Sequence, residues 1–231
     1  MPSSSLSQPV APPATTTQAA AKARFWNRLA RKYAAHPVAD PAGYEATLRR
    51  VRSLLAPEDS VLEIGCGTGT TALRLAQGTG PWLATDVSPT MIEIAREKLA
   101  AEPLPQLRFE IADAEAPCPG GVQHDAVLAF NVLHLMSDLD GALRAILPAL
   151  KPGGLFISKT PCLGEMNPLI PRLLVPLMRA FGKAPHVLSF DAAQLRSALE
   201  RHGLEIESVE RHGTKGKDIR VFVVARKRRG P

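Results

Sequence analysis

Short apolar stretches alternate with helix-like patterns along the middle of this chain, as they do in βαβ proteins. Strands are predicted at Val61–Ile64, Trp82–Asp86, within Leu107–Glu115, at Asp125–Asn131 and at Leu155–Lys159. Two later strands, Glu205–Glu210 and Arg220–Ala225, flank a polar link and suit an antiparallel hairpin. The pattern predicts an α/β fold with five parallel strands followed by a C-terminal hairpin.

Helices are expected before and between these strands. Their predicted ranges are Ala21–Ala34, Tyr44–Leu55, Thr70–Gln77, Pro89–Leu99, Asp140–Leu150 and Asp191–His202. In the first helix Phe25, Leu29 and Tyr33 share one face, because they follow each other at i, i+4 and i+8. Ser88 is the expected N-cap of the helix that starts at Pro89, since proline suits the first helical position.

The segment Val61–Gly69 combines a strand, the acid Glu63 and glycines at alternate positions. Glycine allows a tight turn after a strand and a close approach of a ligand to the main chain. Asp86 ends the next strand about twenty residues later, a spacing at which a carboxylate reaches ribose hydroxyls. The glycine spacing is not that of a dinucleotide site, and Glu63 would repel a pyrophosphate. A ligand with a cationic end fits better, and S-adenosylmethionine has an ammonium and a sulfonium.

Five segments in this order resemble the motifs of a known family. They are Val61–Gly69, Asp86, Asp113, Asp125–His134 and Leu150–Gly154. They are similar to the motifs of class I S-adenosylmethionine-dependent methyltransferases, and most to the ubiquinone/menaquinone-methyltransferase-like branch. The resemblance covers Phe25 to Lys227. It implies a three-layer, Rossmann-like, seven-stranded sheet with N-terminal helices and a helical insertion after the fifth strand.

The resemblance also implies where S-adenosylmethionine binds. The backbone at Gly65, Cys66 and Gly67 would lie beneath the methionine part of the cofactor. Glu63 is implied near the cofactor ammonium, directly or through water, and Asp86 matches the ribose-binding acid. These roles agree with the chemistry of the side chains, because carboxylates accept hydrogen bonds from ammonium and hydroxyl groups.

Other residues are implied at the two ends of the cofactor. Asp113 and the Ala114 backbone match the contact to the adenine amino group, and Met91 falls where an apolar side chain covers the adenine ring. Asn131 falls beside the methionyl group, and Tyr33 is a candidate contact to its carboxylate. Three of these residues have simpler readings: a turn for Asp113, and core or helix packing for Met91 and Tyr33.

Methyl transfer requires few catalytic side chains, because the sulfonium is already a good leaving group. His134 is the best-placed candidate for a general base, since an imidazole titrates near neutral pH; the same residue could be family scaffolding. Lys159, Cys162 and His186 are weaker candidates. No group of acids or histidines has the spacing of metal ligands, so no metal is expected.

The expected division of the chain follows from these patterns. Residues 1–20 form a disordered N-terminal tail, 21–56 a helical lid, 57–227 the cofactor-binding domain and 228–231 a basic tail. The insertion 161–189 in the main domain is rich in apolar residues and begins beside the expected methyl group. It predicts a small-molecule substrate that is apolar, and that could be aromatic or quinone-like. A dimer face, core cover or transient contact with a membrane surface would also explain it.

Composition narrows the partners and the compartment. The chain has 231 residues, 45% of them hydrophobic, and a net charge of +6. Much of the basic excess lies near the ends, and only 5% of residues are aromatic, so nucleic acid is not the expected partner. No apolar stretch reaches the roughly 20 residues of a membrane-spanning helix. The 3 cysteines have no C-x-x-C spacing, which favours a reducing cytoplasm. Whether the N-terminal tail is a targeting segment stays open.

The sequence therefore predicts a cytoplasmic enzyme that methylates a small, rather apolar molecule and releases S-adenosylhomocysteine. Methylation of RNA or protein, helped by the basic ends, is the first alternative. A cofactor-binding partner protein without turnover is the second, and methylation of arsenite or a thiol through the cysteines is the third. The substrate, its acceptor atom and the oligomeric state, with a homodimer open, are not determined by fold or cofactor.

Overall fold

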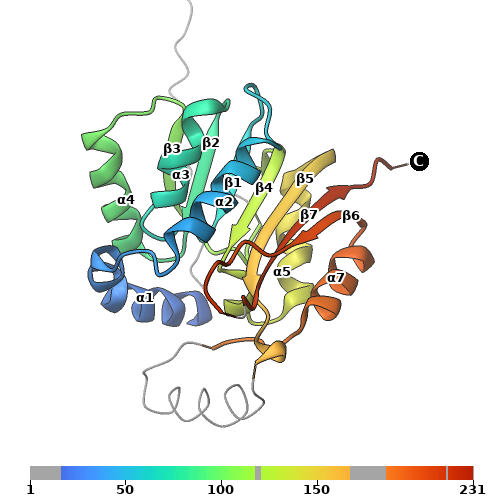
Figure 1. Cartoon of the computed structure of the whole chain (residues 1–231). Helices are drawn as coiled ribbons and strands as arrows, with labels where there is room; N and C mark the ends of the chain where they lie inside the picture. Colours follow the sequence, from blue (N-terminus) through green and yellow to red (C-terminus); the bar gives the residue numbers. More distant parts are fainter. Residues whose placement is uncertain (1–16, 118–120, 167–185, 217, 231) are drawn as a thin grey trace, which may run out of the picture.

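A single sheet of seven strands forms the centre of the computed structural model, which describes residues 17–117, 121–166, 186–216 and 218–230 (Figure 1). The strands are β1 (Val61–Ile64), β2 (Trp82–Asp86), β3 (Leu107–Ile111), β4 (His124–Phe130), β5 (Leu150–Pro161), β6 (Leu204–Glu210) and β7 (Arg220–Lys227). The α-helices are α1 (Thr17–Ala35), α2 (Pro41–Arg52), α3 (Thr70–Leu75), α4 (Pro89–Ala101), α5 (Leu139–Ile146) and α7 (Ala192–Arg201). Short 3-10 helices are η1 (Ala76–Gly78), η3 (Leu133–Leu135), η4 (Leu147–Ala149) and η5 (Leu163–Glu165).

The strand order is β3-β2-β1-β4-β5-β7-β6, which confirms the predicted Rossmann-like sheet and its terminal hairpin. Strands β1 to β5 pair in parallel, while β7 lies between β5 and β6 and runs antiparallel to both. The last strand in sequence is therefore internal, and β6 forms the edge. Because parallel strands end at the same side of a sheet, the polar residues that follow β1, β2, β3 and β4 are brought together there.

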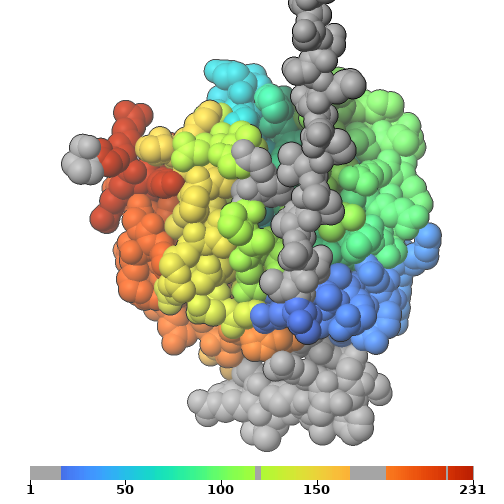
Figure 2. All heavy atoms as spheres, turned by 180° about the vertical axis from the view of Figure 1, so that it is seen from behind, coloured from blue at the N-terminus to red at the C-terminus, as the bar shows by residue number. Residues whose placement is uncertain are grey.

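Helices cover both faces of the sheet and divide its core in two. On one face, buried residues of α2, α3 and α4 pack with Val61, Ala84 and Leu128. On the other face, α5 and α7 pack with Leu62 and Val127 (Figure 2). Adjacent residues of β1 thus point to opposite faces, as the period of a strand requires. Glu63 shares its face with Val61, so its carboxyl lies on the side of α2 and α3.

Helix α1 lies across the edge of the sheet toward which β4 points (Figure 1). It begins at Thr17, ahead of the predicted start at Ala21. Its buried contact differs from the expected face: Ala30 is fully buried and Trp26 packs against Met91 and Ile94 of α4, whereas Leu29 and Tyr33 are 36% and 55% exposed. The apolar spacing correctly predicted a helix, but the face of α1 that packs on the protein is the one that contacts α4.

Candidate functional site

The loop after β1 has the backbone that its glycines predicted. Gly65, Gly67 and Gly69 have φ angles of 64°, 56° and 73°, in the left-handed region that favours glycine. A Cβ at Gly65 would lie 2.3 Å from a side-chain carbon of Val132, so a larger residue does not fit there. At Gly67 the nearest atom to such a Cβ is a ring carbon of Tyr33 at 3.9 Å. The loop is thus packed on one side and open at Gly67.

A cavity of about 450 Å³ lies over this loop and the ends of the neighbouring strands. Its lining includes every residue that the sequence assigned to the site: Tyr33, Glu63, Gly65, Cys66, Gly67, Asp86, Met91, Asp113, Ala114, Asn131 and His134. Three further lining residues were not predicted from the sequence. Helix α1 brings Lys22 and Trp26 to the cavity, and Arg220 lies at the start of β7. The sheet topology thus gathers residues that are up to two hundred positions apart in the chain.

Glu63 is the most deeply buried acid of this cavity, with a residue exposure of 2%. Its Oε2 atom is buried and has no hydrogen-bond partner among the residues that the structure describes. Burial raises the pKa of the Glu63 carboxyl to about 8. A carboxyl held this way costs free energy unless a partner arrives, and a cationic ligand in the cavity would supply one.

Asp86 is held by two backbone N–H groups. Its Oδ2 accepts from Gly67 N at 3.0 Å and its Oδ1 accepts from Ser88 N at 2.9 Å. Burial raises the pKa of the Asp86 carboxyl, while these two hydrogen bonds oppose the rise. Because each carboxylate oxygen can accept more than one hydrogen bond, Asp86 joins the glycine loop to α4 and can still accept from a ligand hydroxyl. Ser88 caps α4, as the sequence predicted, and accepts from Met91 N.

The third acid, Asp113, follows β3 and lies opposite α1. Its Oδ1 accepts from Glu115 N at 3.1 Å, and burial raises the pKa of its carboxyl. Lys22 of α1 forms an ion pair with Glu115, whose oxygens also accept from the backbone and side chain of Ser137 at 2.7 and 3.0 Å. These contacts close one end of the cavity with side chains from three segments.

Asn131 and His134 form the wall after β4. Asn131 has a φ of 54°, the one positive value outside glycine in the part of the chain that the structure describes, and its N–H donates to Lys159 O at 2.7 Å. Such strain is a recurring property of functional sites. His134 lies in η3; its buried Nδ1 has no partner among the described residues, and burial lowers its pKa to about 4. The imidazole is therefore neutral at pH 7.

The weaker candidates fall into two groups. Cys66 lines the cavity, but burial raises the pKa of its thiol well above the usual value, and burial raises that of Cys162 to about 12, so neither is a ready thiolate. Lys159 lies in a second cavity of about 510 Å³ that shares Asn131 and Arg220 with the first. His186 does not line either cavity.

The described ranges 17–117, 121–166, 186–216 and 218–230 contain no cluster of three potential metal ligands. None of their helices is long and apolar enough to cross a membrane. The predicted insertion helices and Cys118 lie outside these ranges.

Comparison with known proteins agrees with this geometry. Residues 61–154 match a family model described as a methyltransferase domain. The biotin biosynthesis bifunctional protein BioCD of Bordetella avium is 33% identical over 135 residues, which cover 57% of this chain and 28% of the relative. A ubiquinone biosynthesis O-methyltransferase of Methylobacterium nodulans is 33% identical over 101 residues, covering 44% and 40%. The chain thus spans less than half the length of these relatives.

Solved structures show the same fold. An S-adenosylmethionine-dependent methyltransferase from Mesorhizobium loti superposes with a TM-score of 0.64 at 24% identity, covering 81% of this chain and 99% of that one. The [4+2]-cyclase SpnF superposes with a TM-score of 0.63 at 23% identity, covering 81% of each chain. Residues 61–154 are thus similar to a methyltransferase domain, and the fold is one that S-adenosylmethionine-dependent methyltransferases share.

Proposed function

We propose that this protein is an enzyme that transfers a methyl group from S-adenosylmethionine to a small molecule and releases S-adenosylhomocysteine. The observation that carries the proposal is the buried, unpartnered carboxyl oxygen of Glu63 beside an open glycine loop. A cationic ligand would pair with it. Asp86 and Asp113 of the same cavity can accept hydrogen bonds from the hydroxyl and amino groups of a nucleoside that carries an amino-acid side arm. The ubiquinone and magnesium-protoporphyrin O-methyltransferases among the relatives support a small-molecule substrate.

The proposed cofactor pose follows the order of the strands. Glu63 accepts from the ammonium, with the backbone at Gly65, Cys66 and Gly67 beneath the methionine part. Asp86 accepts from the ribose hydroxyls. Asp113 and the Ala114 backbone bind the adenine amino group, and Met91 packs on the adenine ring. Asn131 borders the methionyl group, and Tyr33 contacts its carboxylate. All of these residues line the same cavity, which supports one ligand across them.

When bound, S-adenosylmethionine supplies an electrophilic methyl whose bond electrons leave with the sulfur. The chain supplies position and exclusion of water. Trp26 and Lys22 of α1 cover the cavity, which supports the proposal that residues 21–56 act as a lid on the domain 57–227. His134 is neutral at pH 7, and we propose that it takes a proton from the acceptor if that group carries one.

The proposed substrate has an apolar body. Apolar side chains line part of the cavity, among them Phe130, Val132, Leu135, Met136 and Pro161. Pro161 also begins the segment 161–189, which we propose as the substrate cap, although residues 167–185 lie outside the described chain. A cytoplasmic location, a homodimer and contact with a membrane surface belong to the same proposal and rest on composition alone.

The test is to incubate the purified protein with methyl-labelled S-adenosylmethionine and a cell extract, then to separate organic-soluble from acid-precipitable label. We expect label in the organic phase that is absent with Glu63→Gln. Label confined to the precipitate would contradict a small-molecule substrate and favour RNA or protein methylation.

Cofactor binding without label in either phase would favour a binding protein without turnover. The fold alone permits that outcome, since one structural neighbour is named as a cyclase. We expect labelled product to form also when Cys66, Cys118 and Cys162 are replaced by serine. Loss of the labelled product in these variants would favour methylation of arsenite or a thiol through the cysteines.

A further inference from the structure

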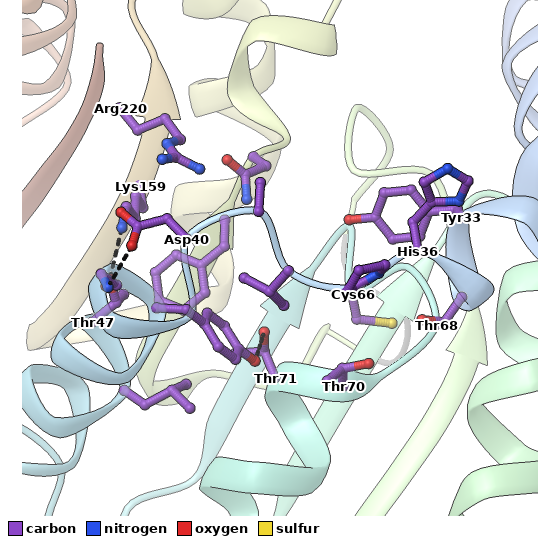
Figure 3. Close-up of a pocket in the computed structure, with 18 of the residues that line it drawn as sticks. Tyr33, His36, Asp40, Thr47, Cys66, Thr68, Thr70, Thr71, Lys159 and Arg220 are labelled. Atoms are coloured by element: carbon purple, nitrogen blue, oxygen red, sulfur yellow. Dashed lines mark hydrogen bonds between the residues drawn. The ribbon is translucent and has the colours of Figure 1, made fainter. Parts of the chain in front are cut away.

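The second cavity, of about 510 Å³, lies beside the cofactor cavity on the α2 side of the sheet (Figure 3). Its lining comes from the end of α1 and the segment that follows it, from α2, from the loop after β1 with the start of α3, and from the ends of β4, β5 and β7. It meets the first cavity along the proposed methionine end of the cofactor, because it shares six lining residues with that cavity: Tyr33, Cys66, Thr71, Phe130, Asn131 and Arg220. Its chemistry is different, because its charged lining includes a buried lysine.

Lys159 is that lysine, with a residue exposure of 8%. Its Nζ donates to Thr47 Oγ1 at 2.7 Å, and Thr47 in turn donates to Gly43 O at 2.9 Å. Among the described residues Thr47 is its one hydrogen-bond partner and no carboxylate forms an ion pair with it, while the negative charges of Asp218 and Asp40 act on it without such contact. An ammonium has three donors, so two of them are left unused at a site largely shielded from water. A buried ammonium with two unused donors is suited to bind an anion.

Arg220 is the second cation of this cavity. In the β5–β7 register Lys159 pairs with Phe222 and Pro161 pairs with Arg220, so Lys159 and Arg220 are diagonal neighbours on one face of the sheet. Figure 3 shows both side chains on the same side of the cavity. The Arg220 Nε donates to Asp218 Oδ1 at 3.1 Å in an ion pair, while its terminal nitrogens make no hydrogen bond within the described chain. Two cations therefore present free donors together.

Asp40 is the carboxylate that lines this cavity, and its oxygens are already occupied. They accept from Gly43 N at 3.1 Å, from Thr214 N at 2.8 Å and from Thr214 Oγ1 at 2.6 Å. These bonds hold the pKa of Asp40 at about 2 and fix its carboxylate as the N-cap of α2. Asp40 thus has a structural role and leaves the free donors of Lys159 and Arg220 unpaired.

Aromatic side chains form part of the wall. Phe130 pairs with Lys159 across β4 and β5, and Tyr44 of α2 also lines the cavity. The N–H of Asn131 donates to Lys159 O at 2.7 Å, which places the end of β4 directly beside the lysine backbone. A ligand here would have its anionic end at the two cations and an apolar body along Phe130, directed toward the methyl group.

We propose that this second cavity binds the methyl acceptor and that the acceptor is a carboxylic acid with an apolar or aromatic body, its carboxylate held by Lys159 and Arg220. The proposal rests on the proposed function. The α-carboxylate of the cofactor has the same chemistry as the proposed ligand group. Arg220 lines both cavities, but Lys159 lines the second one alone, which favours the acceptor as its partner.

The test uses the full chain saturated with S-adenosylhomocysteine and ligand-observed NMR titrations. The probes are cinnamate and hexanoate, each compared with its primary amide. We expect each carboxylate to bind at least tenfold more tightly than its amide, because only the carboxylate brings a negative charge to Lys159 and Arg220. Lys159→Met removes this preference, and Lys159→Arg retains it. The matched control is Lys151→Met at the other end of β5, which keeps the wild-type preference.

The affinity for S-adenosylhomocysteine is measured on the same samples. It is expected to stay within twofold of wild type in each lysine variant. Equal binding of acids and amides, or no binding of either, would overturn the proposal while leaving the cofactor site intact. A tenfold loss of S-adenosylhomocysteine affinity in Lys159→Met would assign the lysine to the cofactor carboxylate and overturn it as well. A wild-type protein that does not bind S-adenosylhomocysteine would instead contradict the proposed function.

Discussion

Single residues set the electrostatics of the site, and Glu63 has the largest influence. Burial raises the pKa of its carboxyl to about 8, far above the value in an unfolded chain. Its position at the end of β1, next to the glycine loop, could be predicted from the sequence. Its missing partner could not, because burial and hydrogen bonding depend on residues that are distant in the chain.

The raised pKa of Glu63 predicts a pH-dependent stability of the cofactor-free protein. Unfolding releases a proton between the unfolded pKa near 4.5 and the folded value of about 8, so the free energy of unfolding falls as pH rises through this window. The slope is at most about 1.4 kcal/mol per pH unit. Glu63→Gln, which is neutral at all pH, should flatten it. Urea unfolding at pH 5, 6.5 and 8 measures the effect; identical slopes in both proteins would contradict it.

Lys159→Met should stabilise the protein while removing the proposed acid preference. Burial lowers the pKa of Lys159, so at pH 7 the folded state holds an ammonium that the unfolded chain hydrates better. Methionine has a similar length and no charge, and we expect a gain of about 1 kcal/mol in the free energy of unfolding. Urea denaturation at pH 7 measures it, with Lys151→Met as the control. A loss of more than about 1 kcal/mol would show that the ammonium is well paired.

His134 predicts the pH profile of the methyl transfer. With a pKa of about 4 it stays neutral from pH 6 to 8, so it contributes no inflection of kcat in this range. If the imidazole accepts a proton, His134→Gln should lower kcat and change KM much less. Steady-state kinetics across this pH range test the role, and an unchanged kcat would assign His134 to packing.

At the scale of elements, α1 links the cover of the site to its acids. Asn27 Oδ1 accepts from Ser88 Oγ at 2.6 Å and from Thr90 N at 3.3 Å, which ties α1 to the start of α4. The backbone of the same Ser88 donates to Asp86. The helix itself was predictable from its apolar spacing. Its docking face was not, because Trp26 rather than Leu29 finds the apolar surface on α4.

This link predicts that cofactor binding protects α1 from hydrogen exchange. Asn27→Ala removes two hydrogen bonds and should weaken S-adenosylhomocysteine binding by roughly fivefold, since each such bond contributes about 1 kcal/mol or less. Hydrogen exchange of residues 17–35 with and without the ligand measures the protection. Arg31→Ala, at an exposed position of the same helix, is the control. Equal exchange with and without ligand would contradict a lid.

At the scale of the whole molecule, the sheet topology decides which residues meet. The order of the strands along the chain and the acids at their ends were predictable, since each lies in one short segment of sequence. The insertion of β7 between β5 and β6 was not predicted, and it is what brings Arg220 beside Lys159. The second cavity therefore has no signature in any single motif, although its two cations decide which ligands it favours.

The most direct test of the account is a calorimetric titration of S-adenosylmethionine into the wild-type protein, Glu63→Gln and Asp86→Asn. We expect one site per chain in the wild type and at least a tenfold loss of affinity in each variant, because each replaces a carboxylate that faces the cavity by a neutral amide. Circular dichroism confirms that the variants are folded. Absence of binding to the wild-type protein, or equal affinity in all three proteins, would contradict the central claim that these acids form a cofactor site.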